Sequence, residues 1–320
     1  MRQTTLCILG GTGFVGRHLA ARLTREGCRV RILTRRRERH RELLVNPDIE
    51  LLAADSHDPD TLTRHLAGVD VVINLVGILN DPDPRGSGFR RAHVELPRKL
   101  VDAARACGVP RLLHMSALNA NAQERQCRYL QTKGEGEDLV HAAAGPDLVV
   151  TSFRPSVIFG PGDGFFNRFA GLLQLAPGVF PLACPQSRFA PVCVHDVTAA
   201  LCRCLDDATG GERLELCGPE VFTLQTLVEY TRAQLGLHRA IIGLGRTLSR
   251  LQAQVLGLLP GQPFTLDNFY ALQLDSICTS NALPLLGIQP TPVEAVVPGY
   301  LGGGGSRARY DAFRRHAGRP

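Results

Sequence analysis

Thr4-Thr5-Leu6-Cys7-Ile8-Leu9-Gly10-Gly11-Thr12-Gly13-Phe14-Val15-Gly16 lies almost at the start of the chain and decides its fold. An apolar run ends at glycines, and an amphipathic segment begins among them. Bare backbone at such a turn lets a pyrophosphate approach the N–H groups, while the helix N-terminus adds partial positive charge. The stretch therefore predicts a buried strand, a phosphate-binding turn and a helix over about 14–26. The candidate cofactor-binding residues here are Gly10, Thr12, Gly13, Phe14, Val15 and Gly16.

Composition limits the class of protein. Of the 320 residues, 44% are hydrophobic and 21% charged, as in an ordinary globular protein. No apolar run is long enough to cross a bilayer, and the first strand leaves no room for a signal peptide, so we expect a cytoplasmic protein. The net charge of +6 comes from dispersed arginines without tryptophan, which argues against nucleic-acid binding. The ten scattered cysteines are expected to be free thiols, and no metal site is expected.

Strand-like and helix-like segments alternate up to about residue 153. The expected strands cover residues 5–9, 29–34, 49–53, 69–75, 111–115 and 147–153. This alternation is typical of an α/β protein with a Rossmann doubly wound parallel sheet. We expect a nucleotide-binding domain over 1–155 and a smaller C-terminal α/β substrate lobe over 156–301, parts of which return to the sheet. Residues 302–320 are expected to form a flexible Gly- and Arg-rich tail.

The end of the second strand bears on the choice of cofactor. Thr34 is followed by Arg35, Arg36 and Arg37. A free ribose 2′-hydroxyl is usually held by a carboxylate at this point, whereas a 2′-phosphate needs cationic donors. Arg35 and Arg36 therefore favour NADP(H) over NAD(H), the alternative being a solvated arginine cluster at a helix start.

Two further strands end in candidate cofactor residues. Asp55 and Ser56 follow the third strand, and Asp55 is also suited to a turn or a helix N-cap. The fourth strand ends in Leu75-Val76-Gly77, at the sheet edge where open α/β sheets bind ligands.

Tyr129 and Lys133 form a Tyr-x-x-x-Lys pair on an expected helix. That spacing puts both side chains on one helix face. A nearby ammonium favours the phenolate and lowers the tyrosine pKa toward working pH, while the lysine can also hold the nicotinamide ribose. Ser116, after the fifth strand, is placed to hydrogen-bond a substrate oxygen. Because Lys99 and Lys133 are the only lysines in the chain, a lysine at this position carries extra weight.

The glycine spacing Gly-x-x-Gly-x-x-Gly, followed by Ser116, Tyr129 and Lys133, resembles the short-chain dehydrogenase/reductase superfamily in its extended and atypical branches. The resemblance implies that Asp55 meets the adenine amino group. It also implies that the segment after Arg154 meets the nicotinamide end of the cofactor, through Pro155, Ser156, Val157 and Ile158. Asn119 and Arg188 are further candidates, for contact with substrate.

The C-terminal third narrows this resemblance. Pro263-Phe264-Thr265-Leu266-Asp267-Asn268 and residues 285–294 look like bacterial relatives of the NADPH-binding accessory subunit of respiratory complex I. In that family the mitochondrial member is thought to act structurally, and other relatives are associated with ubiquinone biosynthesis. The resemblance therefore implies NADPH binding and raises a respiratory complex as a partner.

Leucines and a valine recur at helical spacing over residues 240–259, with Arg246 and Arg250 beside them. The preferred interpretation is a helix packed on the substrate lobe. The alternative is a membrane-facing or quinone-facing surface at the inner face of the membrane, since a basic amphipathic helix can lie in a lipid interface.

The leading functional hypothesis is an oxidoreductase that transfers hydride to or from a carbonyl or alcohol, with a quinone-related substrate as one option. Tyr129 would exchange the proton, Lys133 would tune it and Ser116 would orient the reacting oxygen. The second hypothesis is a non-catalytic NADPH-binding subunit, in which the cofactor only stabilises the fold. A nucleotide-sugar epimerase or dehydratase is third, because no nucleotide-diphosphate clamp is evident in the second half.

Overall fold

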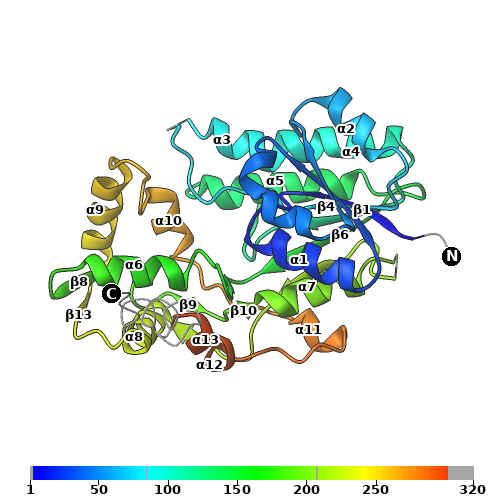
Figure 1. Ribbon diagram of the computed structural model, residues 1–320. Helices are drawn as coiled ribbons and strands as arrows, with labels where there is room; N and C mark the ends of the chain where they lie inside the picture. The colour runs from blue at the N-terminus through cyan, green and yellow to red at the C-terminus, as the bar shows by residue number, and fades with distance from the viewer. Residues whose placement is uncertain (1–2, 84, 207, 302–320) are drawn as a thin grey trace, which may run out of the picture.

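The centre of the computed structural model, which describes residues 3–83, 85–206 and 208–301, is a seven-stranded sheet (Figure 1). The strand order is β11-β6-β5-β4-β1-β2-β3, and every neighbouring pair is parallel. The strands are β1 (Thr5–Leu9), β2 (Arg29–Thr34), β3 (Ile49–Ala53), β4 (Val71–Asn74), β5 (Arg111–Met115), β6 (Val149–Pro155) and β11 (Arg213–Leu216). The Rossmann doubly wound fold is thus confirmed, and β11 brings a later segment back to its edge.

Helices cover both faces of the sheet, as Figure 1 shows. One face carries α1 (Phe14–Arg25), α7 (Val194–Arg203) and α11 (Ala282–Leu285), and the other carries α2 (Pro59–Leu66), α4 (Leu96–Ala106) and α5 (Arg128–Ala142). Because side chains alternate along a strand, Leu6 and Ile8 enter the first core while Cys7 and Leu9 enter the second. Burial on both faces explains the continuous apolar runs in the sequence.

The connections differ in detail from the expected elements. A short helix, η1 (Arg37–Val45), follows β2. The helix that precedes β5 begins as α3 (Ser87–Arg90) and passes through a π-helical turn, η2 (Arg91–Glu95), before α4. Single π-helical turns inside α-helices are frequently found at functional sites.

The C-terminal lobe lies beyond the carboxyl edge of the sheet (Figure 1). Its helices are α6 (Phe166–Leu175), α8 (Leu224–Gln234), α9 (Arg246–Gly257), α10 (Leu266–Ala271), α12 (Val293–Val296) and α13 (Pro298–Leu301). Its short strands are β7 (Ile158–Phe159), β8 (Val179–Leu182), β9 (Arg188–Phe189), β10 (Val192–Cys193), β12 (Phe222–Thr223) and β13 (Ala240–Gly243). Phe159 and Phe166, both fully buried, lie edge to face at 6.0 Å in the centre of this lobe. The predicted tail, 302–320, is outside the described residues.

One expectation about the lobe is wrong. Cys217 and Cys278 form a disulfide that ties the end of β11 to the segment before α11, whereas the other cysteines are free thiols. The two partners are 61 residues apart in sequence, so their spacing gave no sign of the pairing.

The helix expected within residues 240–259 is present as α9, which begins at Arg246 after β13 and packs on the lobe through Ala253. Its buried residues are Ser249 and Ala253, and its leucines face outward. No helix of the described residues is long and apolar enough to span a membrane.

Candidate dinucleotide and active site

The glycine turn between β1 and α1 is shaped by close backbone contacts. Gly10 has a φ of +78°, and a Cβ there would lie 3.0 Å from the carbonyl carbon of Leu75 on the neighbouring strand end. A Cβ on Gly16 would lie only 2.5 Å from the carbonyl oxygen of Gly10. Gly13 is the N-cap of α1 and gives it no side-chain cap, so the amides of Phe14 and the next residues are not covered by a capping side chain. This turn is suited to holding a pyrophosphate.

Positive charge gathers beyond the ends of β2 and β3. Arg35 and Arg36 are exposed, and neither forms an ion pair with another described residue. Nearby, Lys99 Nζ donates to the carbonyl of His57 at 2.9 Å. Burial, and then the charge of Arg91, lowers the pKa of His57, with smaller effects from Lys99 and Arg35. The region beyond β2 and β3 is therefore suited to an anionic group such as a phosphate.

Asp55 and Ser56 lie in the turn that follows β3. The Asp55 carboxylate accepts the backbone N–H of His57 at 3.0 Å, so it shapes the turn. Asp58, not Asp55, is the N-cap of α2, because its side chain accepts from the N–H of Thr61. The turn interpretation of Asp55 is confirmed, and contact with adenine stays a prediction.

Lys133, Ser116 and Gly77 come from three separate elements and meet at the carboxyl edge of the sheet. Lys133 Nζ donates to the carbonyl of Met115, the residue before Ser116, at 2.9 Å. A Cβ on Gly77 would lie 3.0 Å from the same Nζ. The Ser116 hydroxyl is buried and has no hydrogen-bond partner among the described residues. Buried hydroxyls are normally paired, so this one is suited to a ligand oxygen.

Tyr129 starts the same helix, α5, one turn before Lys133. Its half-buried ring lies 5.7 Å from that of His93 and 6.2 Å from that of Phe89, edge to face. Burial raises the pKa of Tyr129 to about 12, and burial lowers the pKa of Lys133 to about 8. The expected lowering of the tyrosine pKa is therefore wrong for this structure, because burial raises the pKa and Cys127 raises it a little further.

Two glycines let α5 approach its neighbours closely. A Cβ on Gly136 would lie 1.8 Å from the carbonyl oxygen of His93 in the π-helical turn, and one on Gly134 would lie 2.2 Å from the backbone nitrogen of Ala122. Neither backbone could stay in place beside a larger residue. The two glycines thus fix the position of α5. Sequence reasoning missed this role of Gly134 and Gly136.

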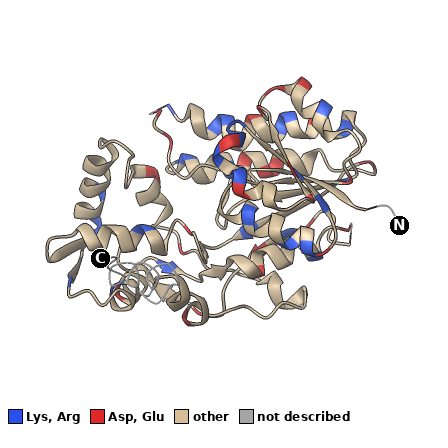
Figure 2. Ribbon diagram, viewed as in Figure 1, with Lys and Arg blue, Asp and Glu red and all other residues tan. Residues whose placement is uncertain are grey.

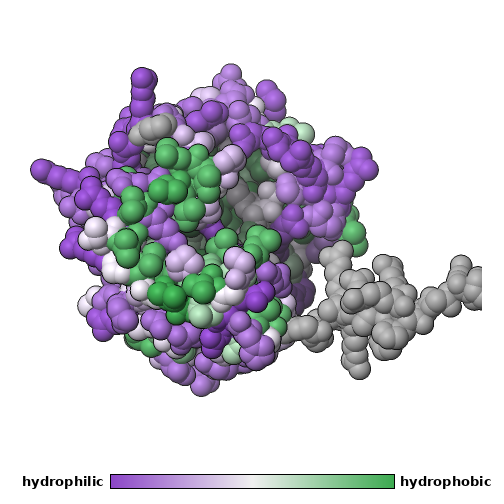
Figure 3. Space-filling view, turned by 90° about the vertical axis from the view of Figure 1, so that its left-hand side faces the viewer, coloured by the Kyte–Doolittle hydropathy of each residue, from purple (hydrophilic) through white to green (hydrophobic). Residues whose placement is uncertain are grey.

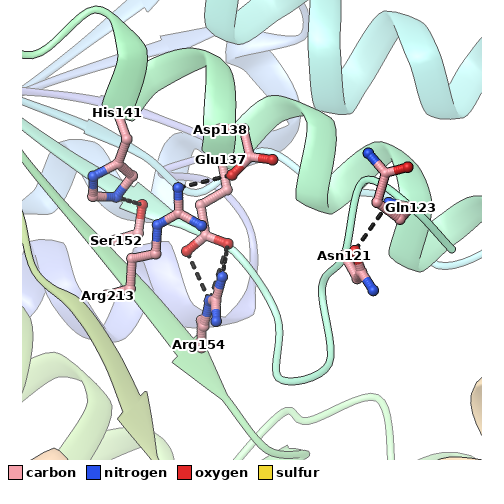
Figure 4. A network of polar contacts seen from close by, with 8 residues as sticks. All are labelled: Asn121, Gln123, Glu137, Asp138, His141, Ser152, Arg154 and Arg213. Carbon is pink, nitrogen blue, oxygen red and sulfur yellow. Dashed lines mark hydrogen bonds and ion pairs between the residues drawn. The ribbon is translucent and has the colours of Figure 1, made fainter.

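A buried ion pair also holds α5 (Figure 4). Arg154 at the end of β6 donates from Nε and Nη2 to the fully buried carboxylate of Glu137, at 2.8 to 3.0 Å. The hydrogen bonds to Glu137 raise the pKa of Arg154 further. One residue on, Asp138 pairs with Arg213 at 2.7 Å in an exposed position. The Glu137 pair joins the Tyr129 helix to the strand that leads into Pro155 and the residues after it.

His93 is a further residue that sequence reasoning missed. Its Nε2 accepts the backbone N–H of Ile78, next to Gly77, at 3.1 Å, and its Nδ1 lies 2.9 Å from the hydroxyl of Thr132. That hydroxyl donates to the carbonyl of Arg128, so Nδ1 carries the proton. Burial, and then the charge of Lys133, lowers the pKa of His93 to about 2. A neutral His93 therefore links the loop after β4 to α5.

The remaining predicted cofactor residues lie along the same sheet edge. Leu75 donates its N–H to Leu9, and the N–H of Val76 is held by the side chain of Asn74. The segment after β6 is also fixed by backbone contacts, namely those of Pro155 with Leu118, Ser156 with Leu216 and Val157 with Val192, before Ile158 enters β7.

The two predicted substrate contacts share one partner in the lobe. Asn119 donates to the carbonyl of Asp275 at 2.9 Å, and Arg188 pairs with the carboxylate of Asp275 at 2.7 Å. Ser156 donates to the carbonyl of the next residue, Ser276, at 2.7 Å. A segment around Asp275 is therefore bound to the residues after β5 and β6 and to Arg188.

The lobe also supplies a cap for the N-terminus of α5. The carboxylate of Asp267 accepts the backbone N–H of Arg128 at 2.6 Å, and Thr265 and Asn268 form a capping box for α10 beside it. This gives a physical reason for the Thr265-Leu266-Asp267-Asn268 motif: it caps the helix that bears Tyr129. Among the described residues, no group of three or more His, Cys, Asp or Glu side chains is arranged to hold a metal.

The fold defines a Rossmann-type protein, and at the carboxyl edge of its sheet Lys133 lies beside Gly77 and the strand end that carries Ser116. Residues 6–211 match the NAD dependent epimerase/dehydratase family. The chain belongs to that family, which confirms the superfamily resemblance of its sequence.

Similar proteins include subunits of a respiratory enzyme and a reductase. The "NADH-ubiquinone oxidoreductase 40 kDa subunit, mitochondrial" of Neurospora crassa is 28% identical over 96% of this chain and 81% of its own length. A "Ceramide reductase" of Caulobacter vibrioides is 36% identical over 61% of this chain and 59% of its own length. Among solved structures, "MoeE5 in complex with UDP-glucose and NAD" matches 97% of this chain and 99% of its own with a TM-score of 0.73. At 18% identity the last likeness concerns the fold alone.

Proposed function

We propose that the protein is an NADP(H)-dependent oxidoreductase that reduces a carbonyl group in its C-terminal lobe. One observation carries this proposal: the unpartnered hydroxyl of Ser116, the ammonium of Lys133 and the bare backbone of Gly77 converge at the sheet edge, and Tyr129 lies one turn before Lys133 on the same helix. A purely structural site has no need of a buried hydroxyl without a partner.

The residues present fit a phosphorylated dinucleotide. The turn from Gly10 to Gly16 would hold the pyrophosphate, and Arg35 and Arg36 would pair with a 2′-phosphate. Lys133 would hold the ribose next to the nicotinamide. When bound, NADPH supplies the hydride.

The protonation states suit the proton donation that carbonyl reduction requires. With a pKa of about 12, Tyr129 carries its proton at neutral pH and is ready to donate it to a carbonyl oxygen that becomes an alcohol. Ser116 would donate a hydrogen bond to the same oxygen, while protonated Lys133 would favour the phenolate that remains.

The similarity to a protein named as a ceramide reductase supports a carbonyl on a lipid-like molecule, and a quinone is the other substrate class that we propose. Asn119 and Arg188 would sense this substrate through the segment around Asp275, which both of them hold.

A second candidate is a non-catalytic NADPH-binding subunit of a respiratory complex, at the inner face of the membrane. The similarity to a mitochondrial subunit over 96% of the chain favours it. A nucleotide-sugar epimerase is the third candidate, because the solved structures that support it resemble this chain in fold alone.

Two measurements test the proposal. Titration should show tighter binding of NADPH than of NADH, and Arg35→Asp should remove that preference; equal affinities in the unchanged protein would refute the phosphate assignment. A screen of NADPH oxidation with ceramide-like ketones and quinones should find turnover. Tyr129→Phe should then lower kcat by about 10²- to 10⁴-fold with NADPH affinity unchanged, because only proton transfer is removed. If no carbonyl or quinone oxidises bound NADPH, the subunit hypothesis takes its place.

A further inference from the structure

Helix α9 presents its apolar side chains to solvent. Leu251 and Val255 are each 53% exposed and Leu248 is 54% exposed, although they share one helical face. The face continues past the helix into Leu258 and Leu259. Beside it, the paired strands β8 and β13 and the end of α6 add Val179, Ile242 and Leu175. We call these eight residues the lobe face.

The lobe face forms a broad surface of the molecule. Figure 3 shows hydrophobic side chains gathered on this side, over α9 and, below it, over the ends of α6 and β8. Large exposed apolar patches on a protein mark sites of interaction with other molecules or with membranes. Scattered single leucines elsewhere need no such explanation.

The two stretches of chain that carry the lobe face have charge of one sign, although Asp275 of a neighbouring segment lines one cavity with Arg246. Residues 164–195 and 230–266, which contain the whole face, include no aspartate or glutamate. The same two stretches include six arginines, at positions 168, 188, 232, 239, 246 and 250. Of these, Arg188 is the one that forms an ion pair within the described part of the chain. Figure 2 shows blue segments and no red on α6 and α9.

We propose that the lobe face docks on an anionic lipid bilayer. A membrane surface offers both things this face lacks, namely apolar depth for the leucines and negative headgroups for the arginines. A second copy of the chain fits poorly, because a two-fold contact would bring two acid-free, arginine-bearing faces together.

The face is also next to the mouth of the proposed site. The side chain of Asn80, in the loop after β4, donates to the carbonyl of Gln262 at 3.0 Å, just past Leu259. Asp267 on α10 then caps the helix of Tyr129. Docking would therefore bring the proposed site close to the lipid. This consequence rests on the proposed function, whereas membrane binding itself does not.

Vesicle binding of the full chain tests the proposal. We expect the full chain to sediment with phosphatidylcholine vesicles that contain about 30% phosphatidylglycerol, an anionic lipid. Binding should be weaker at 0.5 M salt, on the order of several-fold, and at least about tenfold weaker to pure phosphatidylcholine, because screening and loss of headgroup charge both remove attraction to the arginines.

Variants locate the contact. Leu251→Glu with Val255→Glu should reduce binding at least about tenfold, because carboxylates would enter the interface. Arg246→Gln with Arg250→Gln should reduce the preference for anionic lipid without touching apolar residues. Val45→Glu is the matched control: Val45 is 86% exposed on η1, away from the lobe, and its change should leave binding intact.

The proposal is overturned if the unchanged chain ignores anionic vesicles, if both α9 variants bind as well as Val45→Glu, or if size-exclusion chromatography shows a dimer that Val255→Glu converts to a monomer. NADPH titration of each variant shows that it is folded. That measurement also separates this result from the proposed reaction, because vesicle binding needs no turnover.

Discussion

Two helices of this protein depart from the usual burial rule in opposite directions. Helix α5 buries polar side chains, among them Lys133 and the fully enclosed Glu137. Helix α9 exposes apolar ones, among them Leu251 and Val255. Burying a charge is unfavourable unless it is paired, and exposing leucines forgoes the hydrophobic gain, so neither arrangement stabilises the chain by itself.

The difference shows what each helix is for. On α5 the buried polar groups are held by partners, namely Arg154 for Glu137 and the carbonyl of Met115 for Lys133, so they form a rigid site. On α9 nothing in the described residues covers the outer leucines, while Ala253 and Ser249 make the contact with the lobe. This contrast fits the two roles that we propose, a nucleotide site for α5 and a docking surface for α9.

The largest effect should come from breaking the ion pair that holds α5. Glu137→Ala leaves the Arg154 guanidinium without its buried partner, and we expect the free energy of unfolding to fall by about 3–5 kcal/mol. Urea denaturation measures it. Asp138→Ala removes the exposed pair with Arg213 one residue away and should cost about 1 kcal/mol or less. Equal losses in the two variants would show that α5 is not held from within.

An effect that is smaller per pH unit should appear on acidification. His93 and His114 are buried, and burial lowers their pKa values to about 2 and about 3. Both stay neutral in the folded chain but take up protons in the unfolded chain below about pH 6.5, so stability is lost as pH falls from there. Each contributes a slope of up to about 1.4 kcal/mol per pH unit. Denaturation at several pH values should show a shallower slope for His93→Gln, and an unchanged one for the exposed His238→Gln.

Much of the nucleotide-binding half could be predicted from the sequence, since periodicity and glycine spacing are local signals. Strands such as Thr5–Leu9 and Arg111–Met115 have the expected bounds. What failed depends on distant partners: Cys278 finds Cys217, and Asp267 finds Arg128 across 139 residues. The α9 periodicity was real, but a period cannot say whether an apolar face turns inward. Burial that reverses the expected tyrosine pKa is likewise a property of the folded environment.

A several-fold effect is expected when Lys133 loses its proton. Its pKa of about 8 means that it is charged below that pH and neutral above it. If the ammonium holds the nicotinamide ribose, the Kd for NADPH should rise several-fold, by less than about 1.4 kcal/mol, between pH 7 and pH 9. Fluorescence titration measures this. Lys133→Arg keeps its charge throughout and should flatten the dependence, so a wild-type Kd that is constant with pH would remove Lys133 from ribose binding.

The smallest effect should come from the outer face of α9. Leu251→Gln and Val255→Gln should each change the free energy of unfolding by less than about 0.5 kcal/mol, because surface substitutions remove little packing. Ala253→Leu, on the inner face of the same helix, should cost about 1–3 kcal/mol, because it overfills the cluster around Phe269. Urea denaturation of the three variants compares the two faces directly. A loss of 2 kcal/mol or more from Leu251→Gln, on the order of a buried leucine's contribution, would mean that α9 is a core helix after all and would erase its contrast with α5.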